Sequence, residues 1–308
     1  MLIENITEAI GNTPLLRLSK MDEGLPGNIY AKLEGLNPGG SVKDRIALSM
    51  ITDAIASGVI KSSTTIIEAT SGNTGIGIAM IGASLGFKVI IVMPDTMSVE
   101  RRAIIKGYGA EIILTPGVDG MNGSLAKAAI IKETLGDAII LSQFTNVANI
   151  KAHYTTTGPE IYKDLNGAVD ILVSGVGTGG TLTGTGNYLR EKNKNLEIVA
   201  VEPLDSSVLS GNEKGPHKIQ GIGAGFIPDI LDTELYNEII MVSNDDALNT
   251  ARDIAKKSGY LAGISSGAAL HAAIEIASRE ENRDKNIVVV LPDSGERYLS
   301  TDLFALYA

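Results

Sequence analysis

The sequence contains no cysteine and no tryptophan, and only three of its 308 residues are histidine. The absence of cysteine excludes disulfides, thiolate metal sites and a cysteine nucleophile. The histidines His153, His217 and His271 lie far apart in the sequence, so we expect no metal site. Any nucleophile in this chain must therefore be a side chain other than cysteine.

Basic residues are outnumbered, with 26 Lys and Arg against 36 Asp and Glu, and the net charge is −10. This balance argues against a nucleic-acid or anionic-membrane partner, but it leaves room for a local phosphate site. No stretch approaches the roughly 18 consecutive apolar residues that cross a bilayer. The first residues also lack a basic region followed by an apolar run, so we see no signal peptide. We expect a soluble cytoplasmic protein.

The hydrophobic content is 44%, while aromatic residues make up only 4%, which predicts a sizeable aliphatic core. Short apolar strands at residues 64–68, 88–93, 170–173 and 197–202 alternate with amphipathic or apolar helical segments. This alternation indicates parallel βαβ units with helices on both faces. The long glycine-rich stretch 208–226 shows neither pattern and is typical of a functional loop. The sequence predicts an α/β fold.

Residues 37–45 read Asn-Pro-Gly-Gly-Ser-Val-Lys-Asp-Arg and precede a helical pattern of apolar residues. Ser41 is a candidate N-cap, which places Lys43 in the first helical turn at the positive end of the helix dipole. That position disfavours the ammonium form and favours a nucleophilic amine, which can form a Schiff base. The alternative is an ordinary exposed lysine in a capped first turn.

Residues 174–181 read Ser-Gly-Val-Gly-Thr-Gly-Gly-Thr, follow a predicted strand and open a predicted helix. Free backbone N–H groups and the helix dipole make such a turn an anion cradle. The hydroxyls of Thr178 and Thr181 suit a terminal phosphate monoester. The alternative is a plain tight turn.

The same turn matches Gly-x-Gly-x-x-Gly through Gly175, Gly177 and Gly180, and Glu202 ends the next strand. An acidic residue at that distance binds the ribose in dinucleotide-binding folds. An NAD-dependent oxidoreductase is therefore an alternative function, although the motif lies in the middle of the chain.

Three further segments offer polar groups at strand ends or helix starts. Residues 70–75, Thr-Ser-Gly-Asn-Thr-Gly, can donate to a carboxylate or a ring oxygen, or form a satisfied helix cap. Ser265, in the segment 262–268, can cap a helix or point at a ligand. Gln143 opens a polar segment that follows a strand end, where parallel sheets present ligand contacts.

Taken in order, segments 37–45, 70–75, 177–181 and 263–267 resemble the signature of fold-type II pyridoxal-phosphate enzymes, which have the tryptophan synthase β-like fold. Residues 217–226, His-Lys-Ile-Gln-Gly-Ile-Gly-Ala-Gly-Phe, are similar to the O-acetylserine sulfhydrylase (cysteine synthase) branch of that family. The resemblance extends over nearly the whole chain.

The resemblance implies two open twisted sheets with flanking helices and an active site in the cleft between two domains. Residues 47–152 would form a smaller, mobile N-terminal α/β domain. Residues 1–46 and 153–308 would form the larger α/β domain. The resemblance also implies a homodimer.

The resemblance assigns roles to individual residues. Lys43 would hold pyridoxal 5'-phosphate through a Schiff base and act as the catalytic base, and Ser265 would face the ring nitrogen. The phosphate would be held by Gly177, Thr178, Gly179, Gly180 and Thr181. Asn73 would bind the ring oxygen of the cofactor. The substrate carboxylate would be bound by Thr70, Ser71, Asn73, Thr74 and Gln143, with Gly221 bordering the substrate. No metal is implied. One departure is Val147, where the family usually has proline.

The implied reaction is a β-replacement that makes L-cysteine from O-acetyl-L-serine and sulfide through an aminoacrylate, with release of acetate. The alternative within the family is cystathionine β-synthase chemistry, in which homocysteine replaces sulfide. Members of the branch dock the C-terminal tail of serine acetyltransferase, which makes that tail a candidate partner.

Overall fold

The structure, a computed structural model, describes residues 2–70, 72–96 and 98–307. It divides into two compact units, unit 1 with residues 1–10 and 37–149, and unit 2 with residues 11–36 and 150–308. It places residues 1–10 and 37–46 in unit 1 and residues 150–152 in unit 2, whereas the expected smaller domain was 47–152. The physical reason is the helix α1 (Lys43–Ala56), which packs on α2 (Asn73–Leu85) so closely that a Cβ at Gly77 would lie 3.2 Å from the Lys43 carbonyl oxygen.

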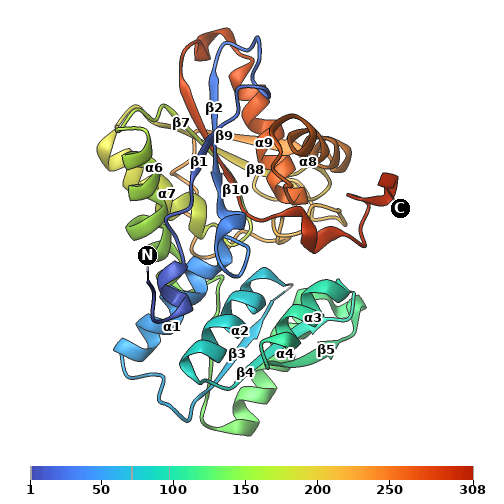
Figure 1. Cartoon of the computed structure of the whole chain (residues 1–308). Helices are drawn as coiled ribbons and strands as arrows, with labels where there is room; N and C mark the ends of the chain where they lie inside the picture. The colour runs from blue at the N-terminus through green and yellow to red at the C-terminus, as the bar shows by residue number, and fades with distance from the viewer. Residues whose placement is uncertain (1, 71, 97, 308) are drawn as a thin grey trace. The chain divides into compact units, whose positions relative to one another are not determined.

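Unit 1 contains a four-stranded parallel sheet in the order β5-β4-β3-β6, of which Figure 1 labels β3, β4 and β5. Its strands are β3 (Thr65–Ala69), β4 (Val89–Pro94), β5 (Glu111–Thr115) and β6 (Ala138–Ile140). In the register of the sheet, Ile67 pairs with Ile90 on one side and with Ile140 on the other. Every residue of β3 and β4 is buried, as expected for central strands covered on both faces.

Helices cover both faces of this sheet. Ile67 and Ala69 pack with Ala128 of α4 on one face, whereas Ile91 and Ile105 lie beside Gly75 of α2 on the other. The helical elements of unit 1 besides α1 and α2 are η1 (Ile6–Ala9), α3 (Val99–Gly107), η3 (Gly117–Asp119) and α4 (Gly120–Leu135). Helix α5 (Val147–Ala152) spans the point where the chain passes from unit 1 to unit 2.

Unit 2 contains a six-stranded sheet in the order β1-β2-β10-β7-β8-β9, in which only the β1–β2 pair is antiparallel. Its strands are β1 (Leu15–Arg17), β2 (Asn28–Leu33), β7 (Ile171–Gly175), β8 (Glu197–Pro203), β9 (Glu238–Val242) and β10 (Asn286–Leu291). The strands predicted at residues 170–173 and 197–202 are confirmed to within two residues.

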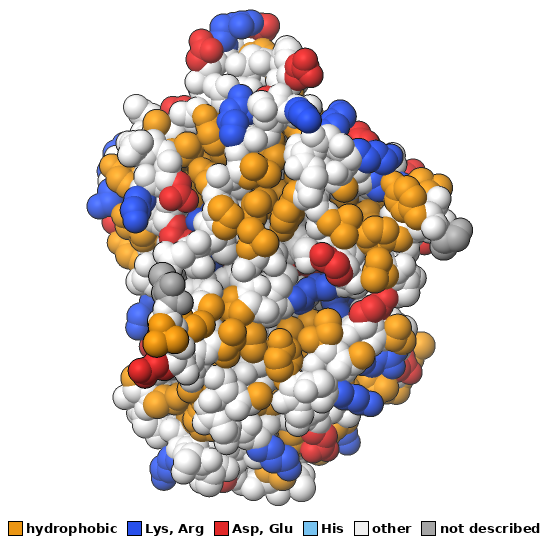
Figure 2. Space-filling model, in the orientation of Figure 1, with side chains coloured by type: hydrophobic (Ala, Val, Ile, Leu, Met, Phe, Trp, Pro, Cys, Tyr) orange, Lys and Arg blue, Asp and Glu red, His pale blue; other side chains and the backbone are white. Residues whose placement is uncertain are grey.

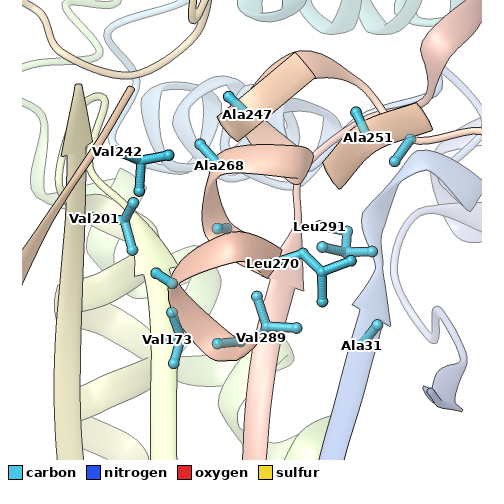
Figure 3. Packing of buried hydrophobic residues seen from close by; sticks show 14 of the residues in the cluster. Ala31, Val173, Val201, Val242, Ala247, Ala251, Ala268, Leu270, Val289 and Leu291 are labelled. Atoms are coloured by element: carbon cyan, nitrogen blue, oxygen red, sulfur yellow. The ribbon is translucent and has the colours of Figure 1, made fainter. Parts of the chain in front are cut away.

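Alternate residues along β7 point to opposite faces and enter different cores. Val173 packs with the α8 and α9 side, and Leu172 packs with the α6 and α7 side (Figure 1). Figure 3 shows the first of these cores, in which Ala268 of α9 approaches Ala247 of α8. The helices of unit 2 are η2 (Glu34–Leu36), the π-helix η4 (His153–Thr157), α6 (Gly158–Asp164), α7 (Gly180–Lys192), η5 (Leu204–Ser206), α8 (Asn244–Ser258), α9 (Ile264–Ala277), η6 (Glu280–Asn282), η7 (Gly295–Tyr298) and η8 (Ala305–Tyr307).

The expectation of an α/β fold with two sheets and flanking helices is confirmed. The stretch 208–226 contains no helix or strand, as the sequence predicted. Within the described residues, no helix is both long and apolar enough to span a membrane. On the face drawn in Figure 2, acidic and basic side chains are interspersed and neither sign gathers into a continuous patch.

Candidate functional site

Lys43 is the first residue of α1, so the predicted position in the first helical turn is confirmed. The backbone N–H of Lys43 donates to the Ser41 hydroxyl at 3.2 Å, although Val42 occupies the N-cap position expected for Ser41. The Asp44 carboxylate reaches back and accepts from the Gly39 N–H at 2.6 Å. A Cβ at Gly39 would lie 2.5 Å from the other oxygen of Asp44, so the carboxylate would have to move to admit any other residue. The turn that carries Lys43 is thus braced by its own helix.

The turn after β3 carries the residues expected to bind a carboxylate. Thr70 and Thr74 are buried, and the Thr70 hydroxyl accepts from the Gly72 N–H at 3.3 Å. Asn73 opens α2, so its segment lies at the positive end of that helix dipole. A Cβ at Gly72 would overlap the Arg101 side chain, which is buried against the turn. Ser71, predicted for the same role, lies outside the described residues.

Gln143 follows β6, the neighbour of β3 in the sheet, and the structure brings it to Thr74. The Thr74 hydroxyl donates to Gln143 Oε1 at 2.7 Å, and this contact orients the amide. Because Oε1 is then occupied, the Nε2 hydrogens are the donors that Gln143 offers to a ligand. Two strand ends of one parallel sheet thereby place hydrogen-bond donors together, which is where such sheets bind ligands.

In unit 2, the predicted anion cradle lies between Gly175, the last residue of β7, and Gly180, the first residue of α7. Gly177 and Gly179 have no room for a side chain. A Cβ at Gly177 would overlap the Gly221 carbonyl oxygen, and a Cβ at Gly179 would lie 2.7 Å from Leu231. Gly179 also has a φ of +85°, a conformation that favours glycine. The cradle is therefore shaped by packing.

The two threonines of the cradle differ in their contacts. The Thr178 hydroxyl lies 3.4 Å from the Gly180 N–H, and Thr181 hydrogen-bonds with His153 Nε2 at 3.1 Å. The other ring nitrogen of His153 hydrogen-bonds with Thr157 at 2.9 Å, and the histidine is fully buried. Sequence reasoning did not connect His153 with the cradle, because it lies 28 residues from Thr181 and in no motif.

Ser265 lies in the first turn of α9 and is buried. The structure brings it beside Gly221, since a Cβ at Gly221 would lie 3.6 Å from Ser265 Oγ. Gly221 has a φ of +98° and its carbonyl approaches Gly177. Three segments that are far apart in sequence, at residues 177, 221 and 265, therefore meet within unit 2.

Glu202, the candidate ribose-binding acid, is occupied by its own loop. Its carboxylate accepts from the N–H groups of Leu209 and Ser210, each at 2.9 Å, and from the Ser210 hydroxyl at 2.6 Å. The side chain is buried. This arrangement removes the sequence argument for a dinucleotide site, because the carboxylate already stabilises the loop that follows β8.

Glu68 is a second buried glutamate, in β3, and sequence reasoning missed it. Its carboxylate accepts from the N–H of Ser142 at 2.9 Å and from the N–H of Gln143 at 3.1 Å. Burial raises the pKa of Glu68 to about 7, and the backbone hydrogen bonds from Gln143, Ser142 and Leu141 only partly oppose this. The available signal was a lone acid within an otherwise apolar strand.

The donors of the cradle fit a phosphate monoester. The turn from Gly177 to the start of α7 combines two glycines that admit no Cβ, Gly177 and Gly179, with two threonine hydroxyls and the N-terminus of a 13-residue helix. Within the described part of the chain, no group of three or more His, Cys, Asp or Glu residues is placed to hold a metal ion.

Comparison with known proteins identifies the family of this chain. The family model described as "Pyridoxal-phosphate dependent enzyme" matches residues 6–293. The chain is 52% identical to a cysteine synthase of Staphylococcus aureus over 304 residues, which is 98% of this chain and 97% of the relative. The crystal structure of a cysteine synthase (OASS) from Entamoeba histolytica is similar with a TM-score of 0.95 and 48% identity, covering 99% of this chain and 91% of that one. An O-acetylserine-dependent cystathionine β-synthase from Helicobacter pylori has a TM-score of 0.94 and 39% identity, covering 99% of both chains. The chain therefore belongs to the family of pyridoxal-phosphate-dependent enzymes.

Proposed function

We propose that this protein makes L-cysteine from O-acetyl-L-serine and sulfide by β-replacement, releasing acetate. The observation that carries the proposal is the braced lysine at the start of α1 in a chain 52% identical to a cysteine synthase over nearly its full length. The alternative of an NAD-dependent oxidoreductase is not favoured, because Glu202 is occupied by its own loop.

The residues present fit pyridoxal 5'-phosphate. Lys43 would hold its aldehyde carbon, Asn73 its ring oxygen and Ser265 its ring nitrogen. The phosphate would be held by Gly177, Thr178, Gly179, Gly180 and Thr181. When bound, this cofactor supplies an electron sink for the Cα–H bond of an amino acid.

The chain itself supplies the proton transfers and the orientation of the substrate. Lys43 Nζ would accept the Cα proton of O-acetylserine and return it to the product after sulfide has added. The Ser265 hydroxyl is neutral, so it does not favour a protonated ring nitrogen as a carboxylate would. Limited delocalisation of charge into the ring favours elimination of the acetoxy group over transamination.

The substrate carboxylate would be bound by the donors of unit 1. Thr70, Asn73 and Gln143 would supply them in the described chain, together with the backbone N–H of Thr74, whose hydroxyl donates to Gln143. Ser71 belongs to the same proposed set. The Nε2 group of Gln143 suits this role because its Oε1 already accepts from Thr74. In unit 2, Gly221 would border the substrate.

The decisive experiment uses purified protein reconstituted with pyridoxal phosphate. Addition of O-acetyl-L-serine should change the visible absorption spectrum, and sulfide should restore it with stoichiometric formation of cysteine. Lys43→Ala should show neither change. A protein that binds the cofactor and yet releases no acetate from O-acetylserine would disprove the proposed function.

A second candidate nucleophile is homocysteine, supported by the similarity to the cystathionine β-synthase from Helicobacter pylori. The two nucleophiles can be compared under identical conditions. We expect a larger kcat/KM for sulfide, since the identity to the cysteine synthases is higher. A larger value for homocysteine would reverse the assignment.

We further propose that the protein acts in the cytoplasm as a homodimer and that it binds the C-terminal tail of serine acetyltransferase. Sedimentation of the purified protein tests the dimer. Titration with the tail peptide, followed by the absorption of the cofactor, tests the partner.

A further inference from the structure

Glu68 is a buried acid for which the proposed reaction has no use. It lies in the central region of the unit 1 sheet and is 2% exposed. Its neighbours β4, β6 and α2 contain no Asp, Glu, His, Lys or Arg. Helix α4 does contain Lys127, Lys132 and Glu133, but it packs on the opposite face of β3, the face of Ile67 and Ala69. Helix α3, on the Glu68 face, does carry charged residues, and its Arg101 lies against Gly72. The hydrogen bonds of the Glu68 carboxylate go to the backbone N–H groups of Ser142 and Gln143.

Those partners belong to the turn that carries Gln143. The two carboxylate oxygens accept from consecutive N–H groups, Oε2 from Ser142 and Oε1 from Gln143. Between them, Ser142 has a φ of +59°, a left-handed conformation that is unfavourable for a residue with a Cβ. Such a conformation persists only where surrounding contacts impose it. A single carboxylate that holds both N–H groups supplies that constraint.

Gln143 is held on three sides. Its N–H is bound by Glu68, its carbonyl oxygen accepts from Asn149 Nδ2 at 2.9 Å, and its side-chain Oε1 accepts from Thr74. The Thr74 contact orients the amide, and the Glu68 contact determines where the backbone that carries the amide lies. The direction of Gln143 Nε2 therefore depends on Glu68.

We propose that Glu68 is a positioning residue, which holds the turn at Leu141 to Gln143 so that the Gln143 amide is preorganised for the carboxylate of the amino-acid substrate. This inference rests on the proposed function, since it takes O-acetylserine as the ligand. Glu68 touches neither substrate nor cofactor in this scheme and acts only through Gln143.

Glu68→Gln is the matched substitution, because an amide keeps the volume but offers only one acceptor oxygen to two N–H groups. We expect KM for O-acetylserine to rise about tenfold. We expect kcat to stay within about threefold and the absorption of the bound cofactor to stay unchanged. Gln143→Ala should raise KM by a similar factor. The double variant, Glu68→Gln with Gln143→Ala, should have the same KM as Gln143→Ala alone, because the two changes disrupt the same interaction of the Gln143 amide with the substrate.

Asp22→Asn is the control. Asp22 is also buried and its carboxylate accepts from a backbone N–H group, that of Ile29 at 2.7 Å, but it lies in unit 2 and in none of the segments assigned to the site. Its substitution should leave KM for O-acetylserine unchanged. Hydrogen exchange gives a readout independent of turnover, since the amides of Ser142 and Gln143 should lose protection in Glu68→Gln and keep it in Asp22→Asn.

The results separate the two proposals. If the unmodified protein does not convert O-acetylserine and sulfide to cysteine, the proposed function fails. The positioning role fails if the protein makes cysteine but Glu68→Gln leaves KM and amide protection unchanged. It also fails if the effects of Glu68→Gln and Gln143→Ala on KM are additive in the double variant. Should Glu68→Gln not fold, Glu68→Asp withdraws the carboxylate by one methylene and is expected to give the same rise in KM.

Discussion

Two of the glycine-rich turns, at residues 70–75 in unit 1 and 175–181 in unit 2, follow a strand and open a helix in the same way but are held by different contacts. Each follows a parallel strand and opens a helix of 13 residues. In unit 2, the turn is confined by backbone and apolar atoms, namely the Gly221 carbonyl and Leu231. In unit 1, the turn lies against Arg101, and its partner segment at Gln143 is held by Glu68 and Thr74.

The difference is consistent with the roles proposed for the two turns, cofactor binding in unit 2 and substrate binding in unit 1. A site shaped by packing keeps its form across a wide range of pH, which suits a cofactor that stays bound. A site held by hydrogen bonds to an ionisable group responds to pH and to its ligand, which suits a substrate that comes and goes. The four predictions below test this contrast, beginning with the largest expected effect.

Lys43→Ala should abolish most of the turnover, which we assign to unit 1, without abolishing phosphate binding, which we assign to unit 2. We expect turnover to fall by about 10²–10⁴-fold or more, the range associated with loss of a general base. The phosphate group should still bind, because none of the cradle residues is changed. Steady-state kinetics and the phosphorus content of the dialysed protein measure the two effects. Turnover within tenfold of the unmodified protein would show that another residue carries the proton.

Glu68 should make the free energy of unfolding depend on pH. Its pKa is raised in the folded state from the ordinary value of 4.5 to about 7, chiefly by burial. Its contribution to stability is therefore complete below the unfolded pKa and is lost as the pH rises through the folded pKa. At about 1.4 kcal/mol per pKa unit, the loss is on the order of 3 kcal/mol.

The measurement is urea unfolding of the unmodified protein and of Glu68→Gln at pH values from about 5 to 8. The difference in unfolding free energy between the two proteins should change from about pH 5 up to the folded pKa of about 7 and level off by about pH 8. Because other titrating groups are common to both proteins, their effects cancel in the difference. A difference that is constant with pH would mean that Glu68 does not titrate there.

Gly177→Ala should damage unit 2 by overpacking. The new Cβ would overlap the Gly221 carbonyl, and backbone atoms on both sides must move. We expect a loss of about 1–3 kcal/mol in stability, together with weaker binding of the cofactor phosphate. Gly107→Ala is the control, since a Cβ there meets nothing within 4 Å. Equal stability of the two variants would refute the view that the cradle is shaped by packing.

Thr74→Val should have the smallest effect, confined to the substrate side. It removes the hydroxyl that donates to Gln143 at 2.7 Å, which is expected to cost about 1 kcal/mol of stability. KM for O-acetylserine should rise a few-fold, while the absorption of the bound cofactor stays the same. Thr74→Ser retains the hydroxyl and should behave like the unmodified protein. A spectral change in Thr74→Val would show that the two turns are not independent.

Much of the fold could be predicted from local patterns, because buried parallel strands read as short apolar runs and the turns between strand and helix are marked by glycine. The runs at residues 64–68 and 88–93 correspond closely to β3 and β4. The boundaries of the two units were less predictable. Residues 37–46 join unit 1 through the packing of α1 on α2, a contact between helices that no local pattern records.

The candidate site likewise combines residues that local motifs mark and residues that only the folded structure identifies. Lys43, the 177–181 turn and Ser265 stand in recognisable motifs, and the roles assigned to them stay predictions until the variants are measured. His153 and Glu68 stand in no motif, and their contacts with Thr181 and Gln143 join residues that are 28 and 75 positions apart. Glu202 was open to a ribose-binding interpretation until its loop was seen to occupy it.

The sequence by itself determined the α/β class, the aliphatic core, the lysine at a helix start and the glycine-rich turn between β7 and α7, because each depends on residues that are near neighbours in the chain. Only the tertiary structure decided which glycines are indispensable, which buried acid is tied to its own loop and which one holds the turn of Gln143. Those properties depend on atoms brought together by the pairing of strands and the packing of helices, and burial changes the ionisation of an acid only after that packing has excluded water.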